Sequence, residues 1–224
     1  MKQPRPTPGT DRFRFERELW RQGVTLVAGV DEAGRGPLAG PVVAAAVILP
    51  AAWGEGGLPP ELAGLNDSKQ LPEAKREAFF LALTTLPGVH FGIADCTAGV
   101  IDRINILQAT HRAMNAALAL LSPPPAHVLM DGPRVPTLHF PQTPIVKGDA
   151  LSYSIAAASV LAKVTRDRRM VEYDRRWPEY GFASHKGYGT AAHLAALRQH
   201  GASPIHRWSF APLKPDQREL FDRA

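Results

Sequence analysis

Two apolar, β-branched runs near the N-terminus constrain the fold more than any other feature of the chain. Residues Val24–Val30 and Val42–Leu49 are almost wholly apolar, which is typical of strands that are covered on both faces. The polar segment Asp31–Gly40 lies between them and has glycines at positions 34, 36 and 40. Because glycine adopts backbone conformations that other residues avoid, the two runs are expected to pair as a hairpin with an unusual turn.

Strands and helices alternate along the rest of the chain. Further strands are predicted over residues 90–95 and 127–130, and helices over residues 15–23, 72–86, 97–121, 152–177 and 190–200. A hairpin followed by alternating elements predicts an α/β fold. Its mixed central β-sheet should be flanked by helices, and the last helix should form a C-terminal helical extension.

The composition favours one compact domain. The chain has 224 residues, 45% of them apolar, which is enough for a single sizeable core. We expect residues 1–20 to form an N-terminal appendage to this core. The single cysteine, Cys96, excludes an internal disulfide and a thiolate zinc cluster.

The charge balance points to an anionic partner. The net charge is +5 and the isoelectric point is about 9.6, which suits a nucleic acid or a membrane surface. The first twenty residues lack the apolar stretch of a secretory signal, and the longest apolar runs are shorter than the roughly 20 residues that span a bilayer. These features predict a cytoplasmic protein with no membrane partner.

The positions of four acidic residues predict a metal site. Asp31 and Glu32 end one buried strand, Asp131 ends another, and Asp149 directly precedes the long helix. Carboxylates among apolar sequence are costly unless they are paired or bind a metal. Because no histidine or thiolate cluster accompanies them, an all-oxygen site for Mg²⁺ or Mn²⁺ is expected. Several converging acids are also what two cations need in phosphoryl chemistry.

The adjacent pair Asp31–Glu32 raises a geometric difficulty. Neighbouring residues of a regular strand point to opposite faces, so both side chains cannot face one cleft. We expect the strand to end or twist there, with Gly34 and Gly36 providing the freedom. Alternatively, Glu32 contributes through its backbone carbonyl. Taken alone, an Asp-Glu pair would more often be a solvated strand end.

Several motifs in a fixed order give the chain a close resemblance to bacterial ribonuclease HII. They are GVDEAGRGPLAGPVV at residues 29–43, DSKQL at 67–71, MDG at 130–132, the block 147–167 and SHKGYGT at 184–190. The resemblance covers about residues 20–212. It implies a ribonuclease H-like fold, makes residues 21–212 a ribonuclease H-type catalytic domain and leaves residues 213–224 as a C-terminal tail.

The resemblance implies a specific reaction. The family hydrolyses the RNA strand of RNA–DNA hybrids and incises duplex DNA on the 5′ side of single embedded ribonucleotides, leaving a 3′-hydroxyl and a 5′-phosphate. Carried over by motif, the catalytic metal ligands are Asp31, Glu32, Asp131 and Asp149, acting with two metal ions.

Substrate contacts are also implied by the resemblance. Gly34, Arg35 and Gly36 match the loop that contacts the 2′-hydroxyl through main-chain groups. Tyr188 matches the tyrosine that packs against the neighbouring sugar, and its alternative interpretation is an aromatic at the rim of the core. The candidates for phosphate contacts, or else ordinary surface charges, are Lys69, Lys147, Lys163, Arg166 and Lys186.

Three further residues receive structural interpretations. Asp67 is expected near a helix start and Asp167 within the long helix. His111 lies on the apolar stripe of its helix, so a hydrogen-bonded histidine at the core edge is favoured over a catalytic role.

The C-terminal tail carries Gln217, Leu220 and Phe221, which resemble the peptides that bacterial repair proteins insert into the sliding clamp. Alternatively, the tail packs its own apolar side chains on the domain.

We expect a monomer. The rival interpretations are a non-catalytic hybrid-binding or clamp-associated module, a junction resolvase and the sister ribonuclease HIII. The sequence does not distinguish Mg²⁺ from Mn²⁺ and assigns no role to residues 1–10 and 50–66.

Overall fold

The computed structural model describes residues 11–214. Its strands are β1 (Val27–Ala33), β2 (Val42–Ile48), β3 (His90–Cys96), β4 (His127–Asp131) and β5 (Gln142–Ile145). Its α-helices are α1 (Arg14–Arg21), α2 (Trp53–Gly56), α3 (Glu73–Thr85), α4 (Ala98–Ala119), α5 (Gly148–Leu151), α6 (Tyr153–Arg176), α7 (Phe182–His185) and α8 (Ala191–His200). Short 3₁₀ turns cover Pro60–Leu62, Ser68–Gln70 and Pro178–Tyr180.

The five strands form one mixed sheet in the order β3-β2-β1-β4-β5. β1 pairs with β2, and β2 with β3, in antiparallel fashion, whereas the pairs β1–β4 and β4–β5 are parallel. The predicted hairpin and the predicted mixed sheet are both confirmed. β1 lies at the centre of the sheet, which explains why its residues are apolar on both faces.

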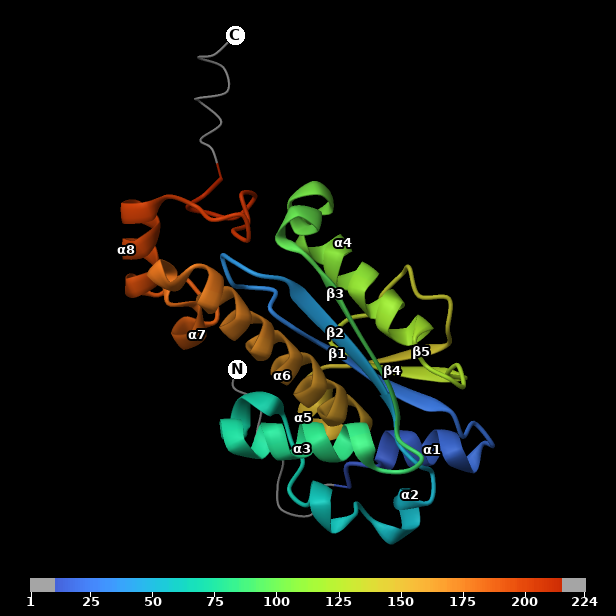
Figure 1. The fold of residues 1–224 in the computed structure, drawn as a ribbon. Helices are drawn as coiled ribbons and strands as arrows, with labels where there is room; N and C mark the ends of the chain where they lie inside the picture. Colours follow the sequence, from blue (N-terminus) through green and yellow to red (C-terminus); the bar gives the residue numbers. More distant parts are fainter. Residues whose placement is uncertain (1–10, 215–224) are drawn as a thin grey trace, which may run out of the picture.

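Helices cover both faces of the sheet, as Figure 1 shows: α4 lies on one face and α6 with α3 on the other. The α4 face buries Ala28, Val30 and Met130, and the α6 face buries Val43 and Ala45. The long helix lies very close to β1, because a Cβ placed on Gly29 would be 2.1 Å from the backbone of Ser154. Small residues on both elements therefore set the distance between helix and sheet.

The N-terminal helix α1 is attached to the start of α6 by a buried carboxyl group. Oε1 of Glu16 accepts hydrogen bonds from the hydroxyls of Ser152 (2.5 Å) and Ser154 (2.7 Å) and from the Ser154 backbone N–H. Burial raises the pKa of Glu16. Because α5 lies just before these serines, α1 supports the segment that carries Asp149.

The C-terminal segment folds back onto the loop between β1 and β2. Three backbone hydrogen bonds join them. The N–H of Gly40 donates to the carbonyl oxygen of Ile205, the N–H of Arg207 to that of Leu38, and the N–H of Leu38 to that of Gly187. The C-terminal helical extension is thus hydrogen-bonded to the loop that follows Asp31 and Glu32. In residues 11–214, no helix combines the length and apolar character needed to cross a membrane.

Candidate active site

Three of the predicted acids meet at one end of the sheet. Asp31 comes from β1, Asp131 from the end of the adjacent parallel strand β4, and Asp149 from α5. One carboxylate oxygen from each lies within 4.8 Å of the other two. Asp131 also accepts a hydrogen bond from the backbone N–H of Gly148 (2.6 Å), which holds α5 against β4. Neighbouring strand ends therefore bring together Asp31 and Asp131, which are 100 positions apart in the chain.

Glu32 follows Asp31 without a break in β1, so the expectation that the strand ends at this pair is wrong. The pairing stays regular through Asp31↔Ala45, Glu32↔Ala44 and Ala33↔Val43. Regular pairing directs Asp31 toward α6 and Glu32 toward α4, as the alternation of a strand requires. The backbone carbonyl of Glu32, the other alternative, remains compatible with this geometry.

The cluster has an electrostatic cost when no cation neutralises it. Burial, helped by the charges of Glu32 and Asp131, raises the pKa of Asp31 well above its usual range. Burial, together with Asp131, likewise raises the pKa of Asp149 to about 6. Buried carboxylates that repel one another are stabilised by a bound cation, and an all-oxygen donor set suits a hard divalent ion. The three residues therefore fit a divalent metal ion.

A cationic and a hydroxylic group lie beside the acids. Nζ of Lys69 is 3.6 Å from a carboxylate oxygen of Asp149, and its side chain is 74% exposed. The hydroxyl of Ser68 shares a buried hydrogen bond of 2.8 Å with that of Ser159 on α6. Lys69 is thus anchored at one end by a short turn while its ammonium group stays in solvent. As expected, Asp67 starts this turn, because its carboxylate accepts from the Lys69 backbone N–H.

A cleft of about 290 Å³ opens next to the acids. Glu32, Arg35 and Tyr188 line it, together with Ala33, Gly34, Gly36, Ser68, Lys69, Ser159, Lys163 and Arg166. Tyr188 is 48% exposed, and a Cβ on Gly36 would lie 3.8 Å from its ring. The predicted sugar-contacting loop and the predicted tyrosine therefore share one cleft with Glu32.

Gly34 is a position in the loop where a side chain does not fit. Its φ is +95°, and a Cβ there would lie 2.0 Å from Nε of Arg166 and 2.7 Å from the Pro41 carbonyl oxygen. An L-residue would be strained at this φ even without the clash. The guanidinium group of Arg166 thus occupies the space that a side chain at position 34 would need.

Arg166 is not available for phosphate, so that expectation is corrected. Its side chain is 1% exposed and donates to the carbonyl oxygens of Pro41 (3.0 Å), Lys186 (3.0 Å) and Ala39 (3.1 Å). A second buried arginine, Arg207, binds the same loop from the C-terminal segment. The sequence analysis missed Arg207, since nothing around it in the chain marks it as part of a site.

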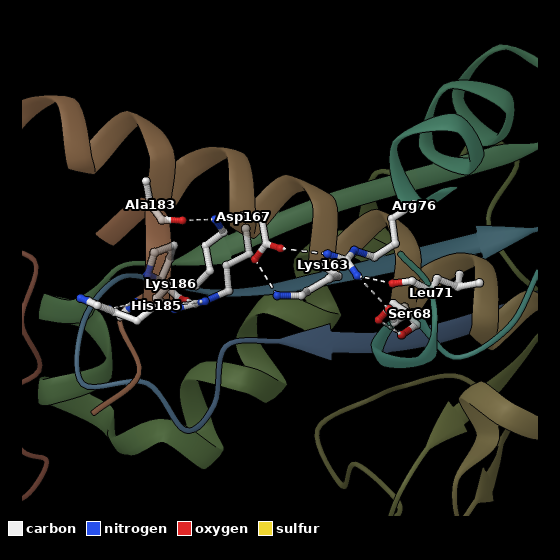
Figure 2. A network of polar contacts seen from close by, with 12 residues as sticks. Ser68, Leu71, Arg76, Lys163, Asp167, Ala183, His185 and Lys186 are labelled. Atoms are coloured by element: carbon white, nitrogen blue, oxygen red, sulfur yellow. Dashed lines mark hydrogen bonds and ion pairs between the residues drawn. The ribbon is translucent and has the colours of Figure 1, made fainter. Parts of the chain in front are cut away.

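The other predicted cations have different surroundings. Asp167 lies between Lys163 (2.7 Å) and Arg76 of α3 (3.8 Å), as Figure 2 shows, so its structural role is confirmed. Nζ of Lys186 donates to the Ala183 carbonyl oxygen and faces a second hollow, outside the cleft. Lys147 is exposed.

His111 lies closer to the acids than expected. It is 9% exposed and lines a small cavity of about 40 Å³ with Glu32, Arg35 and Asp131. Its Nδ1 atom has no hydrogen-bond partner in the part of the chain that the structure describes, which differs from the hydrogen-bonded histidine that we expected. Burial and the neighbouring Arg35 lower its pKa.

The residues proposed to bind the clamp cannot be compared with the structure in the same way. Gln217, Leu220 and Phe221 lie outside the described residues.

A family model and the curated relatives show the family of this chain. The family model of ribonuclease HII matches residues 28–213. Ribonuclease HII of Geobacillus kaustophilus is 56% identical over 202 residues, which are 90% of this chain and 74% of that protein. The ribonuclease H2 structure from Pyrococcus horikoshii OT3 superposes with a TM-score of 0.66 at 26% identity and covers 88% of this chain and 97% of that one.

Two solved structures below 25% identity share the fold alone. The structure of the PCNA:ribonuclease HII complex from Archaeoglobus fulgidus aligns at 21% identity and a TM-score of 0.63, over 88% of this chain and 99% of that chain. Bst ribonuclease HIII in complex with Mn²⁺ aligns at 19% identity and a TM-score of 0.66, over 87% of this chain and 70% of that chain. The expected ribonuclease H-like fold is thus confirmed. On the family match and the high identity over most of its length, this chain belongs to the ribonuclease HII family and is a type 2 ribonuclease H.

Proposed function

We propose that this ribonuclease H cleaves the RNA strand of RNA–DNA hybrids and incises duplex DNA on the 5′ side of a single ribonucleotide. One observation carries the proposal: the oxygens of Asp31, Asp131 and Asp149 converge next to a cleft that is lined by Gly34–Gly36 and Tyr188. The acids suit phosphodiester hydrolysis, and the glycine loop suits close approach to a sugar.

Two divalent cations, Mg²⁺ or Mn²⁺, are proposed as cofactors. Asp31, Asp131 and Asp149 would hold them, with Glu32 contributing from the other face of β1 through its carboxylate or its backbone carbonyl. When bound, such ions supply Lewis-acid chemistry, namely activation of a water and stabilisation of a departing oxygen. The related ribonuclease HIII structure was solved with Mn²⁺.

The remaining residues of the cleft position the duplex. Lys69 is proposed to contact a phosphate, because its ammonium group is exposed and close to Asp149. Main-chain groups of Gly34–Gly36 would recognise the 2′-hydroxyl, and the exposed ring of Tyr188 would pack on the adjacent sugar. For Lys186, a phosphate contact is also proposed; it would require the ammonium group to leave the Ala183 carbonyl.

The deciding experiment is cleavage of a DNA duplex that contains one ribonucleotide, with Mn²⁺ and with EDTA. We expect one metal-dependent cut on the 5′ side of the ribonucleotide. Tyr188→Ala should slow this cut by about tenfold, the effect of losing roughly one good contact. Binding without cleavage would favour the non-catalytic hybrid-binding module, and an equal rate for Tyr188→Ala would remove Tyr188 from the site.

The C-terminal tail is proposed to bind the sliding clamp. The observation that favours this second role is the solved structure of a PCNA:ribonuclease HII complex, from Archaeoglobus fulgidus. Gln217, Leu220 and Phe221 are the proposed contacts. Deleting residues 217–224 should abolish binding to the clamp and leave cleavage unchanged, whereas unchanged clamp binding would contradict the proposal.

A further inference from the structure

Arg207 is completely buried, and its side chain binds a single loop. It lies in the segment after α8 and is 0% exposed. Its guanidinium group donates to the carbonyl oxygens of Gly34 (2.6 Å), Arg35 (2.9 Å) and Gly40 (2.9 and 3.0 Å). Thus every hydrogen bond that this side chain makes in residues 11–214 ends on the loop between β1 and β2.

This arrangement is electrostatically costly, so it is unlike an ordinary ion pair. Among the residues that the structure describes, no carboxylate forms an ion pair with Arg207. Burial and the nearby Arg166 guanidinium lower the pKa of Arg207 to about 9. A buried cation without a counter-charge is tolerated only when its donors are fully used, and charge-assisted bonds to carbonyl oxygens provide this.

The orientation of the two peptide groups follows from these bonds. In a trans peptide unit the C=O and the N–H point in opposite directions. Because the carbonyls of Gly34 and Arg35 point at Arg207, the N–H groups of Arg35 and Gly36 point away from it. Neither N–H donates to any group in the described part of the chain. Gly36 lies on the cleft side of the loop, opposite the Tyr188 ring.

Arg166 connects this loop to the segment that carries the tyrosine. It donates to Ala39 and Pro41 on one side and to Lys186 on the other. The Leu38 N–H also donates to Gly187, next to Tyr188. The two elements proposed to recognise the sugar are therefore held by a common frame of buried arginines.

We propose that Arg207 is a positioning residue for recognition of the ribose: it turns the Gly34 and Arg35 carbonyls inward, so that the amides of Arg35 and Gly36 present two free donors to the 2′-hydroxyl. This inference rests on the proposed function and deepens it. Arg207 touches no substrate. It determines whether the loop can tell a ribonucleotide from a deoxyribonucleotide.

The test compares two duplexes of the same sequence, one all-DNA and one with a single ribonucleotide. With Mn²⁺ present, the KM of the ribonucleotide duplex and the inhibition constant of the all-DNA duplex are measured for the wild type, Arg207→Gln and Arg207→Lys. We expect Arg207→Gln to raise KM by about tenfold, the loss of about one hydrogen bond, and to leave the inhibition constant within about twofold. The KM of Arg207→Lys should fall between those of the wild type and Arg207→Gln, because lysine keeps the charge but not the fork of donors.

Arg17→Gln is the matched control. Arg17 of α1 also donates two hydrogen bonds to a backbone carbonyl, that of Gly54, besides its ion pair with Asp11, and it contacts neither the loop between β1 and β2 nor Tyr188. Its loss should lower stability without changing the ratio of the inhibition constant to KM. A folded Arg207→Gln protein with the wild-type ratio would overturn the positioning role.

Hydrogen exchange on the wild type covers the case in which the Arg207 variants do not fold. Backbone amides in residues 34–36 should gain protection when the ribonucleotide duplex is added and not when the all-DNA duplex is added. Equal protection by both duplexes would overturn the inference. If the wild type shows no preference for the ribonucleotide duplex at all, the proposed function fails. If it shows the preference and the Arg207 variants keep it, only the positioning role fails.

Discussion

The molecule has two buried charge clusters, one of carboxylates and one of guanidinium groups, and they differ in whether the protein itself balances their charge. The carboxylates of Asp31, Asp131 and Asp149 repel one another, and their surroundings raise the pKa of Asp31 and Asp149. The guanidinium groups of Arg166 and Arg207 have their charge answered by backbone carbonyl oxygens. The carboxylate cluster therefore needs a cation from outside the protein, whereas the arginine cluster already has its hydrogen-bond acceptors within the protein. The acids are thus organised for chemistry, and the arginines form a fixed frame.

This difference implies separable effects of mutation. Removing a carboxylate should abolish activity and leave the fold intact or more stable. Disturbing the arginine frame should cost stability, and it should change the recognition of substrate before the chemistry. The following predictions test that separation.

The largest effect is expected for Asp131→Asn. The amide is neutral and a poorer ligand for a hard cation, so we expect cleavage of the single-ribonucleotide duplex to fall by at least about 100-fold. Binding of the duplex and the melting temperature should stay close to the wild type. Asp95→Asn, on the exposed side of β3, is the control and should keep full activity. A fully active Asp131→Asn enzyme would show that the acids do not form the catalytic site.

A pair of glycine substitutions tests the frame. Gly34→Ala places a methyl group 2.0 Å from Nε of Arg166 at a φ of +95°, so the free energy of unfolding should fall by about 1–3 kcal/mol. Gly36→Ala meets nothing closer than 3.8 Å, and its stability should change by less than about 0.5 kcal/mol. Urea unfolding measures both. Equal losses in the two variants would mean that Arg166 does not constrain the loop.

Asp149→Asn should stabilise the metal-free protein. The folded-state pKa of Asp149 is raised to about 6 from an ordinary value of 3.8, so its contribution to stability is present below about 3.8 and is lost as the pH rises through about 6. At pH 8 in EDTA, the variant should melt a few degrees (~2–4 °C) higher than the wild type. Added Mn²⁺ should raise the melting temperature of the wild type more than that of the variant. If Asp149→Asn melted at a lower temperature than the wild type in EDTA, the charged Asp149 would not be destabilising the metal-free protein.

The smallest effect concerns the histidines behind Tyr188. His206 is buried, its Nε2 lies 2.9 Å from Nε2 of His193, and burial together with His193 lowers the pKa of His206 to about 4. Because the unfolded chain takes up a proton near pH 6.5, stability should be full above about 6.5 and decline as the pH falls toward 4. His206→Gln should flatten the melting temperature against pH by a few degrees (~2–4 °C) between pH 7 and 5. An identical slope in both proteins would exclude His206 as the cause.

Much of the site could be predicted because its signals are local. Asp31 and Asp131 follow apolar runs, and the ends of adjacent strands meet, so their convergence could be expected from order and polarity alone. Glu32 was harder, because the glycines after it suggested a break in the strand. In the structure the ladder with β2 continues through Ala33, since hydrogen bonding to β2 holds the strand in its regular register.

Arg166 and Arg207 mark where prediction from sequence stops. Family motifs and residue type identified Arg166 as a phosphate contact or an ordinary surface charge, and Arg207 carried no signal at all. The order of apolar and polar residues specified the α/β layers, the hairpin and the acids at strand ends, because burial and strand alternation act on neighbouring residues. Which carbonyls a buried guanidinium group would find depended on bringing residues 34 and 207 together, 173 positions apart. That contact exists only once the chain has folded, because it is the long-range packing that leaves those carbonyls facing inward without partners of their own.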